Sequence, residues 1–397
     1  MRREFPRLLV ATEFPPNASG GGPAVVRQML RGWPTEKLFW WSCRPDQDQR
    51  SRQEVASHFI AHIPERLYPQ RRLTRLKAGL LRNGWTSWAS ARFKAAAREC
   101  QPAVIWAIPH QWSIPPLAKI LRAGGTPYHI SIHDYPDTRN AEEKLGKKTT
   151  AQMLAQLERL YREANSRDVI SNEMAADMQT RTGRAAENIL HAGLEGADFS
   201  YLKLKAYAPR DAIKIAYAGT IVAEQSFLLL LESLARIRPR LTKPIELHFF
   251  GAHSYREAPW FRKEWMTEHG DLDGSELRTV LREFDWGLAP MEVTDENPRY
   301  NRYSLPTKIV SYLAAGLGMI CSGHRESTVS CLARKYSLGV AFDDSNLEMI
   351  DDSLVNALSQ TDVWSRYRSE ITRCATNEFD ADAMRARLFA SLGVNGL

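Results

Sequence analysis

Three basic residues lie in one loop of the sequence, directly before a segment of helical character. Arg299, Arg302 and Lys308 follow an apolar run that ends at Pro290. Phosphate groups are bound in proteins by Arg and Lys side chains through charge-assisted hydrogen bonds. The loop therefore indicates an anion site, and the alternative is an ordinary strand–loop–helix unit whose basic side chains are only solvated.

The helix that follows this loop strengthens the indication of an anion site. It is expected to begin near Pro306, which suits a first helical turn, and to end at Gly316. Either Ser304 or Thr307 is expected to cap it, with Leu305 between them. A helix N-terminus presents unpaired N–H groups and a positive dipole, so it favours a phosphate.

A second candidate loop follows the first apolar run of the chain. It contains Gly20, Gly21 and Gly22 and opens a helix expected at residues 24–31. Consecutive glycines allow close approach of backbone to a ligand. The spacing is neither that of a dinucleotide-binding loop nor that of a Walker A loop. A merely flexible turn is the alternative.

Two further loops carry polar groups after apolar runs. His133 and Asp134 are expected at the carboxyl end of a strand, where an imidazole can contact a substrate hydroxyl or move a proton. A metal site that adds His129 is rejected, because no further ligand has a suitable spacing. In the fourth loop, Gly219 permits close approach, and Thr220 and Gln225 are candidate donors to phosphate oxygens.

Apolar runs alternate with helical patterns in two series, which predicts an α/β protein with two doubly wound parallel sheets. The first series occupies about residues 1–195, periodicity is lost over 194–210, and the second series occupies about 211–375. Helices of the first series are expected at residues 92–100, 116–122, 141–164 and 174–182. Those of the second are expected at 227–237, 274–283, 307–315 and 327–335. Ligands of such sheets bind in the loops after the strands.

Composition places the chain among ordinary globular proteins. Its 397 residues are 44% hydrophobic and 25% charged, and the five cysteines contain no C-x-x-C pair. A reducing compartment is therefore expected, with neither a disulfide framework nor a zinc knuckle. The N-terminus is expected to be a first strand rather than a signal peptide, and no segment reaches the roughly 20 apolar residues of a membrane span.

The net charge of +7 is unevenly distributed. Residues 71–88 combine Arg71, Arg72, Arg75 and Arg82 with leucines at helical spacing and two tryptophans. A basic amphipathic segment can lie on an anionic membrane surface, whereas the alternative is a surface helix that buries its leucines in its own domain. Nucleic-acid binding ranks last, because no recognised nucleic-acid motif accompanies the charge.

Several of these segments together resemble the retaining nucleotide-sugar glycosyltransferases of the GT-B fold (family 4-like, group 1). The resemblance spans nearly the whole chain and rests on the glycine loop, IHD, SNEMAADMQTRTG with NILHAGLEGADF, IAYAGT, LHFFG, and DWGLAP with SLPTKIVSYLAAGLGMICS. It implies an acceptor-side domain over residues 1–195, joined by a C-terminal helix over 379–397, and a donor domain over 211–375.

The resemblance also implies roles for the candidate residues. It implies metal-independent transfer from a nucleoside-diphosphate sugar to a hydroxyl of a surface-glycan or lipid-linked acceptor, with no other cofactor. His133 and Asp134 are expected to contact the reacting sugar or the acceptor. The residues expected to bind the donor are Gly20, Gly21, Gly22, Gly219, Thr220, Gln225, Arg302, Ser304, Leu305, Pro306, Thr307 and Lys308.

The chain also departs from the family. Members often carry paired glutamates around the diphosphate loop, where this chain has Tyr303 and Ser311, and an Arg/Lys pair where it has Thr220 and Gln225. Arg299, Arg302 and Lys308 are expected to compensate, and a nearby acidic cluster, Glu292, Asp295 and Glu296, is a candidate source of the missing sugar-binding carboxylate.

These departures leave two alternatives to a transferase: a non-catalytic GT-B subunit that binds a partner enzyme or a glycan, and, ranked lower, a sugar-nucleotide epimerase. The expected location is cytoplasmic, with peripheral association at the inner membrane face.

Overall fold

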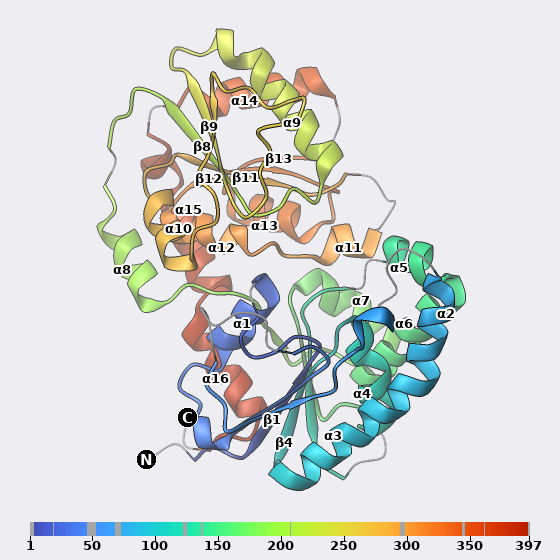
Figure 1. Cartoon of the computed structure of the whole chain (residues 1–397). Coiled ribbons are helices and arrows are strands. Elements are labelled where there is room, and N and C mark those ends of the chain that lie inside the picture. Colours follow the sequence, from blue (N-terminus) through green and yellow to red (C-terminus); the bar gives the residue numbers. More distant parts are fainter. Residues whose placement is uncertain are drawn as a thin grey trace. The chain divides into compact units, whose positions relative to one another are not determined.

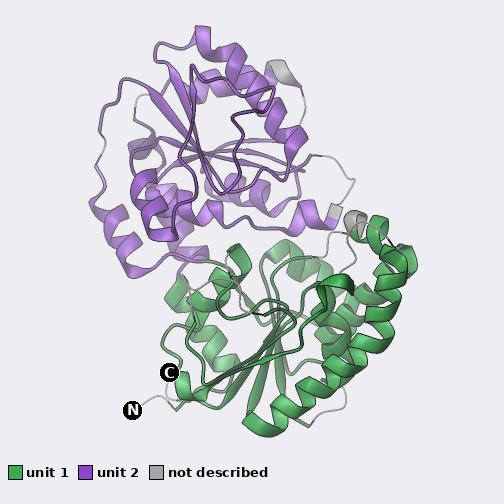
Figure 2. Ribbon diagram, viewed as in Figure 1, with its two compact units in different colours: residues 1–192, 381–397 green, residues 193–380 purple. Residues whose placement is uncertain are grey.

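The computed structural model divides the chain into two α/β units, residues 1–192 with 381–397 and residues 193–380 (Figure 2). The residues that it describes are 4–18, 20–45, 53–67, 73–121, 125–135, 138–206, 208–293, 298–343, 346–360 and 362–395. Of the expected residues, Arg71, Arg72, Asp295 and Glu296 lie outside this set.

The first unit is built on a seven-stranded parallel sheet in the order β3-β2-β1-β4-β5-β6-β7 (Figure 1). Its strands are β1 (Leu8–Thr12), β2 (Leu38–Ser42), β3 (Ser57–Ile60), β4 (Val104–Ile108), β5 (Tyr128–Ile132), β6 (Ser166–Val169) and β7 (Asn188–Ile189). Its helices are α1 (Gly21–Met29), α2 (Thr74–Leu80), α3 (Thr86–Cys100), α4 (Ile114–Ile120), α5 (Thr138–Leu145), α6 (Lys147–Glu163), α7 (Asn172–Thr182) and α16 (Ala381–Ser391). Strands β1, β2, β4 and β5 are buried along their whole length, as expected for parallel strands covered on both faces.

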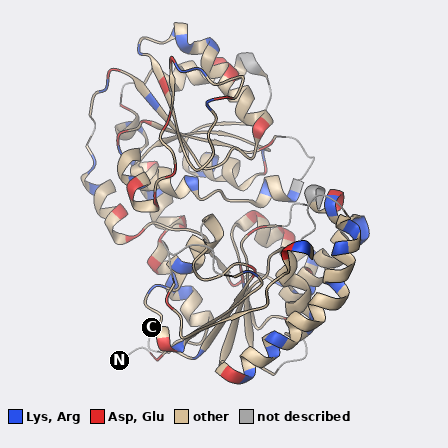
Figure 3. Cartoon of the chain, viewed as in Figure 1, with Lys and Arg blue, Asp and Glu red and all other residues tan. Residues whose placement is uncertain are grey.

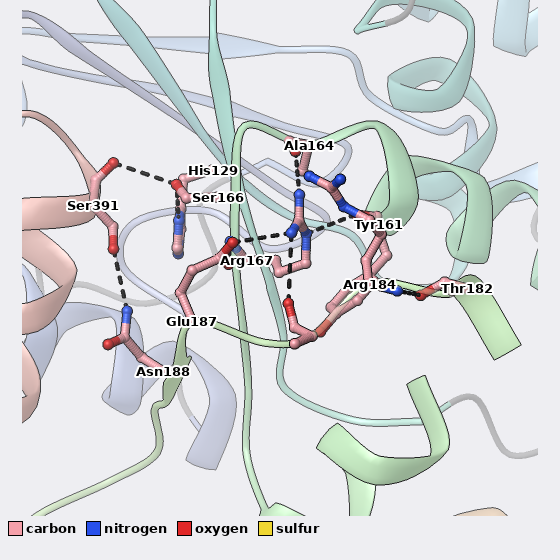
Figure 4. A network of polar contacts seen from close by, with 11 residues as sticks. His129, Tyr161, Ala164, Ser166, Arg167, Thr182, Arg184, Glu187, Asn188 and Ser391 are labelled. Carbon is pink, nitrogen blue, oxygen red and sulfur yellow. Dashed lines mark hydrogen bonds and ion pairs between the residues drawn. The ribbon is translucent and has the colours of Figure 1, made fainter. Parts of the chain in front are cut away.

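The C-terminal helix α16 belongs to the first unit, where it packs against α1 and the core of β1, β2 and β4. Polar contacts fasten its end (Figure 4). The carbonyl of Ser391 accepts a hydrogen bond from Ser166 Oγ at 3.4 Å, and Ser391 Oγ accepts one from Asn188 Nδ2 at 3.2 Å. The last helix thus covers part of the sheet that contains the first strands of the chain.

The second unit contains a six-stranded parallel sheet in the order β10-β9-β8-β11-β12-β13. Its strands are β8 (Ile213–Ala218), β9 (Ile245–Phe250), β10 (Met266–Glu268), β11 (Trp286–Pro290), β12 (Gly318–Ser322) and β13 (Gly339–Phe342). Its helices are α8 (Gly196–Leu204), α9 (Glu224–Ile237), α10 (Gly274–Leu281), α11 (Pro298–Tyr303), α12 (Lys308–Ala315), α13 (Thr328–Tyr336), α14 (Leu347–Leu358) and α15 (Val363–Glu378). The expected fold class, two Rossmann-like sheets with helices, is confirmed.

Some expected elements are wrong in detail. The helix expected at 141–164 is two helices, α5 and α6, because Gly146 between them adopts a φ of 84° that interrupts the helix. The segment that lost periodicity contains α8, and the unpredicted elements α11, α14, α15 and β10 are also present. Among the described residues no helix has the length and apolar character of a membrane span.

Strands β8 and β11 separate toward their carboxyl ends, and one side chain fills the gap between them. Their pairing is limited to Ile215 with Trp286 and Ala216 with Gly287. Beyond these pairs the buried Tyr312 of α12 accepts from the N–H of Ala218 at 2.9 Å, and its hydroxyl lies 3.2 Å from the carbonyls of Ala216 and Leu288.

The ring of Tyr312 also explains a glycine in the adjacent strand. A Cβ at Gly287 would lie 2.3 Å from the ring of Tyr312. Tyr312 therefore holds α12 against the strands in one position.

Replacing Tyr312 with Phe should destabilise the second unit by about 1–3 kcal/mol, because the buried N–H of Ala218 would lose its acceptor. Urea unfolding followed by circular dichroism would measure this, with an unchanged denaturant slope. An unchanged midpoint would show that α12 is held by packing alone.

Candidate functional site

The order of strands in the first unit reverses beside β1, which lies between β2 and β4. In doubly wound sheets this reversal separates two neighbouring loops and creates a binding crevice at the carboxyl ends of the strands. Glu13 directly follows β1, Arg44 follows β2, and His110 follows β4. These three residues form a cluster at the point of reversal.

The carboxylate of Glu13 is the centre of this cluster. It is 3% exposed, and it accepts hydrogen bonds from Arg44 Nη2 at 2.6 Å and from His110 Nδ1 at 3.0 Å. Burial alone would raise the pKa of Glu13, but the hydrogen bond and charge of His110, together with Arg44, lower it. The His110 side chain is 42% exposed, so its second ring nitrogen is available to a ligand.

The pKa of His110 is shifted upward. Burial would lower it, but the hydrogen bond to Glu13, the charge of Glu13 and the charge of Asp134 outweigh that effect. A histidine bonded through Nδ1 to a buried carboxylate is held in one orientation and suits hydrogen bonding or proton transfer at its other nitrogen.

His133 and Asp134 follow β5, as expected, one strand beyond His110. Both ring nitrogens of His133 are buried without a hydrogen-bond partner among the described residues. Burial lowers the pKa of His133 to about 4, so its imidazole is neutral at pH 7. A buried imidazole with two unsatisfied nitrogens suits a ligand hydroxyl.

The glycine loop leads directly into α1. Gly20 precedes the helix with a φ of 103°, a conformation that favours glycine, and the carbonyl of Gly20 accepts from the N–H of Ala24. Gly21 and Gly22 form the first turn, so the helix begins three residues earlier than expected. A Cβ at Gly22 would meet open space, which leaves this turn accessible to a ligand.

The second unit has its own strand reversal, between β8 and β11. Gly219 follows β8 with a φ of 90°, and a Cβ at Gly251 after β9 would approach the Gly219 carbonyl to 3.3 Å. Thr220 and Gln225 are both exposed in the loop and helix that follow. The two glycines thus keep the backbone compact at the carboxyl edge of this sheet.

Lys308 is the first residue of α12 and lies at this edge. Its Nζ is 3.9 Å from the centroid of the Tyr217 ring, and no acidic residue of the described chain lies within ion-pair distance of it. Burial lowers its pKa to about 7. A cation so placed lacks an anionic partner, and a bound phosphate would supply one.

The expected caps of this helix are wrong. Thr307 occupies the cap position, but its side chain makes no capping hydrogen bond, and the buried Ser304 Oγ has no hydrogen-bond partner in the described part of the chain. Instead, the N–H groups of Ile309 and Val310 donate to the carbonyls of Pro306 and Thr307. This tight turn leaves the N–H groups of Thr307 and Lys308 as the donors at the helix terminus, with Leu305 preceding the turn.

Arg302 is engaged within the second unit. Its guanidinium contacts Glu326 at 3.2 Å and His324 Nε2 at 3.2 Å. Arg302 is only partly exposed, and Arg299 also has interactions within the described chain. A phosphate bound to Arg302 would therefore compete with Glu326, whereas no acid in the described ranges of the chain competes for Lys308.

Glu292 does not stand free to bind a sugar. Its carboxylate accepts from the N–H of Gln225 at 3.2 Å and from Ser226 Oγ at 3.0 Å, at the start of α9. A negative charge already occupies this helix N-terminus, so Gln225 and its backbone are poor donors to a phosphate. The carbonyl of Thr220 accepts from the Tyr217 hydroxyl at 3.0 Å.

Three residues of the candidate site were missed by sequence reasoning: Glu13, Arg44 and His110. Glu13 was included in the first apolar run, and His110 follows Pro109 after the fourth strand. The sequence did contain an indication of these residues, because each lies within two positions of the carboxyl end of a strand. Their grouping depends on the strand order, which the local sequence does not disclose.

Comparison with known proteins identifies the fold. No family model and no curated protein matches the sequence. Sucrose-phosphate synthase from Thermosynechococcus elongatus superposes with a TM-score of 0.69 at 12% identity, over 97% of this chain and 98% of that one. α,α-Trehalose 6-phosphate synthase from Burkholderia multivorans gives 0.65 at 13%, over 98% and 96%.

WaaG, a glycosyltransferase involved in lipopolysaccharide biosynthesis, gives a TM-score of 0.64 at 11% identity, over 98% of this chain and 100% of that one. The chain is thus similar in structure to GT-B glycosyltransferases, and at these identities the likeness concerns the fold.

Replacing Glu13 with Gln should lower the pKa of His110, because the ion pair that raises it is removed. The folded pKa of Glu13 lies below the ordinary carboxyl value of 4.5, and that of His110 lies above the ordinary imidazole value of 6.5. The pair therefore stabilises most between these two pH values, and its contribution is lost as pH falls below or rises above them.

Histidine NMR titration and pH-dependent unfolding would measure both effects, with Glu54→Gln as an exposed control. An unchanged His110 titration would contradict the assigned contact.

Replacing Lys308 with Met should stabilise the protein at pH 7 by about 1–2 kcal/mol, less than the full pKa shift implies because part of the side chain reaches solvent. In the unfolded chain Lys308 is protonated below pH 10.5, whereas in the folded chain it is protonated only below about pH 7. The stability gained by the substitution should therefore grow as pH falls from 10.5 to about 7. Thermal unfolding across this range is the measurement, and the exposed Lys263→Met is the control. A stability gain that does not vary with pH would contradict the lowered pKa of Lys308.

Proposed function

We propose that this protein is a metal-independent glycosyltransferase that moves a sugar from a nucleoside-diphosphate donor to a hydroxyl of a surface-glycan or lipid-linked acceptor, with retention at the anomeric carbon. The observation that carries the proposal is Lys308 at the N-terminus of α12, in a GT-B fold, where no described acidic residue forms an ion pair with it. WaaG, one of the proteins of similar structure, is involved in lipopolysaccharide biosynthesis, which supports a surface-glycan acceptor.

The second unit supplies the groups that a departing nucleoside diphosphate needs. The N–H groups of Thr307 and Lys308 and the Lys308 ammonium would stabilise the negative charge that develops as the bond to the sugar breaks. Phosphate binding would also favour the charged form of Lys308 and restore its ordinary basicity. Arg302 would contribute by exchanging Glu326 for phosphate.

The first unit supplies neutral and charged groups suited to sugar hydroxyls. His133 is neutral, and its two buried nitrogens have no partner among the residues that the structure describes, so it would hydrogen-bond a sugar hydroxyl without opposing the positive charge on the ring. His110, oriented by Glu13, would contact an acceptor hydroxyl.

Calorimetric titration with uridine, guanosine and cytidine diphosphates tests donor binding. One of the three should bind saturably, and Lys308→Met should weaken it about tenfold, as expected for loss of one charge-assisted contact. Lys263→Met should leave the affinity unchanged. Absence of saturable binding by all three would favour the alternative, a non-catalytic subunit, which the residues Tyr303 and Ser311 in place of the usual glutamates also support.

Transfer itself is tested with the matching nucleotide sugars. His133→Ala should lower turnover more than nucleotide affinity, because its proposed contact is with sugar rather than diphosphate. Proton NMR of the product should show the donor's anomeric configuration. An inverted product would contradict retention and would instead assign His110 with Glu13 as the base that deprotonates the acceptor.

We infer in addition a cytoplasmic protein that associates peripherally with anionic membrane through the segment ending at Trp88. In the described part of this segment, Leu73, Leu76, Leu80 and Trp88 are 68%, 60%, 50% and 47% exposed, so these leucines are not buried in their own domain. Basic residues recur along the same helices, α2 and α3 (Figure 3). Exposed apolar side chains flanked by cations suit the interface of an anionic bilayer.

Co-sedimentation with vesicles tests this association. The protein should bind phosphatidylserine-containing vesicles and not neutral ones, and a Leu76→Ser, Leu80→Ser variant should lose most of the binding because it removes inserted apolar surface. The exposed Met349→Ser is the control. Salt should weaken the binding, since exposed charges are screened. Equal sedimentation of native and double-variant protein would exclude this surface.

A further inference from the structure

A cavity of about 350 Å³ lies at the amino-terminal edge of the second sheet. Its wall includes Arg210 before β8, Asp285 before β11 and Gly316 before β12, so it is on the sheet edge opposite to Lys308. All of its lining residues belong to the second unit. Its volume falls within the range of small-molecule sites, and the proposed transfer does not use it.

The cavity wall contains more basic side chains than acidic ones. Arg210 forms ion pairs with both acidic residues of the wall, Asp285 at 2.8 Å and Glu283 at 3.9 Å. Lys205 and Arg282 have no acid within ion-pair distance in the described part of the chain. Within the described ranges of the chain, the cavity therefore carries two basic side chains that no acid neutralises.

Both of these cations lie against aromatic rings. The guanidinium of Arg282 is 4.0 Å from the centroid of the Tyr201 ring, and its buried Nε has no hydrogen-bond partner among the described residues. Lys205 Nζ lies 5.0 Å from the Trp364 ring. A guanidinium that stacks on a ring keeps the donors of its edge for a phosphate or carboxylate.

Lys205 also connects the cavity to α12. Its Nζ donates to the carbonyls of Ala315 at 2.7 Å and Gly316 at 2.9 Å, at the C-terminus of the helix that begins with Lys308. Burial, with Arg210 nearby, lowers the pKa of Lys205 to about 8. The two ends of α12 are about 12 Å apart.

We propose that this cavity binds a small phosphate monoester carried on a ring, such as a sugar phosphate. The phosphate dianion pairs with Arg282 and Lys205, and Tyr201, Trp364 and Ala206 receive the ring. An anion at Lys205 competes with the carbonyls of α12, so an occupied cavity changes the affinity of the opposite edge for nucleotide. This last consequence rests on the proposed function, whereas binding to the cavity does not.

Titration calorimetry with glucose 6-phosphate, inorganic phosphate and glucose tests the binding. Glucose 6-phosphate should bind saturably in the sub-millimolar range, phosphate more weakly, and glucose not at all. Arg282→Gln should weaken binding about tenfold or more. Arg366→Gln removes an arginine 5.4 Å from the Tyr367 ring outside the cavity and should leave binding unchanged.

No saturable glucose 6-phosphate binding up to about 10 mM, or equal losses in both variants, would overturn the proposal. Equal affinity for inorganic phosphate would overturn recognition of the ring. If Arg282→Gln fails to fold, the indole N–H resonance of Trp364, which donates to the Lys205 carbonyl at 2.9 Å, should still shift in the native protein on adding ligand. An unmoved resonance at saturation would place the ligand elsewhere.

Nucleotide affinity measured with and without glucose 6-phosphate tests the connection through α12. A changed affinity supports it, and an unchanged affinity overturns the connection while leaving the cavity's binding intact.

Discussion

The candidate site of each unit depends on one constraint, the reversal of strand order beside the first strand of its sheet. Neighbouring strands at a reversal send their loops to opposite sides, which opens a crevice but leaves backbone groups without partners. In the second unit Tyr312 resolves this conflict, because its hydroxyl bonds to both β8 and β11 where their ladder ends. Its side chain simultaneously positions α12, and therefore Lys308, at the crevice.

The candidate sites of the two units differ in how their charged side chains are neutralised. In the first unit the buried carboxylate of Glu13 is neutralised by Arg44 and His110, so that cluster is complete without a ligand. In the second, Lys308 faces an aromatic ring and no acid of the described chain, and burial lowers its pKa to about 7. Buried charges are costly unless paired, so a lysine retained in this position is most simply explained by an anion that arrives with the substrate. A nucleoside diphosphate is such an anion.

Local features of the chain were predictable where local physics decides them. The end of α12 at Gly316, whose φ is 67°, and the position of Lys308 in its first turn follow from helix-terminating and helix-starting signals. The break at Gly146 was missed because the helical pattern continues on both sides of it. The Glu13–His110 pair was missed because its members are 97 residues apart and meet only through strand order. The contacts of Glu292 were not predicted for a similar reason, since its partners in α9 lie 66 and 67 residues earlier in the chain.

The most direct test of the account is amide NMR of the second unit's loops during titration with the nucleoside diphosphate that binds. The N–H signals of Thr307 and Lys308 should shift and become protected from hydrogen exchange, because among the described residues these groups at the start of α12 have no hydrogen-bond acceptor. The N–H of Gln225 should change little, since Glu292 already accepts from it. Unchanged signals at Thr307 and Lys308 at saturation, with changes at Gln225 instead, would contradict the central claim.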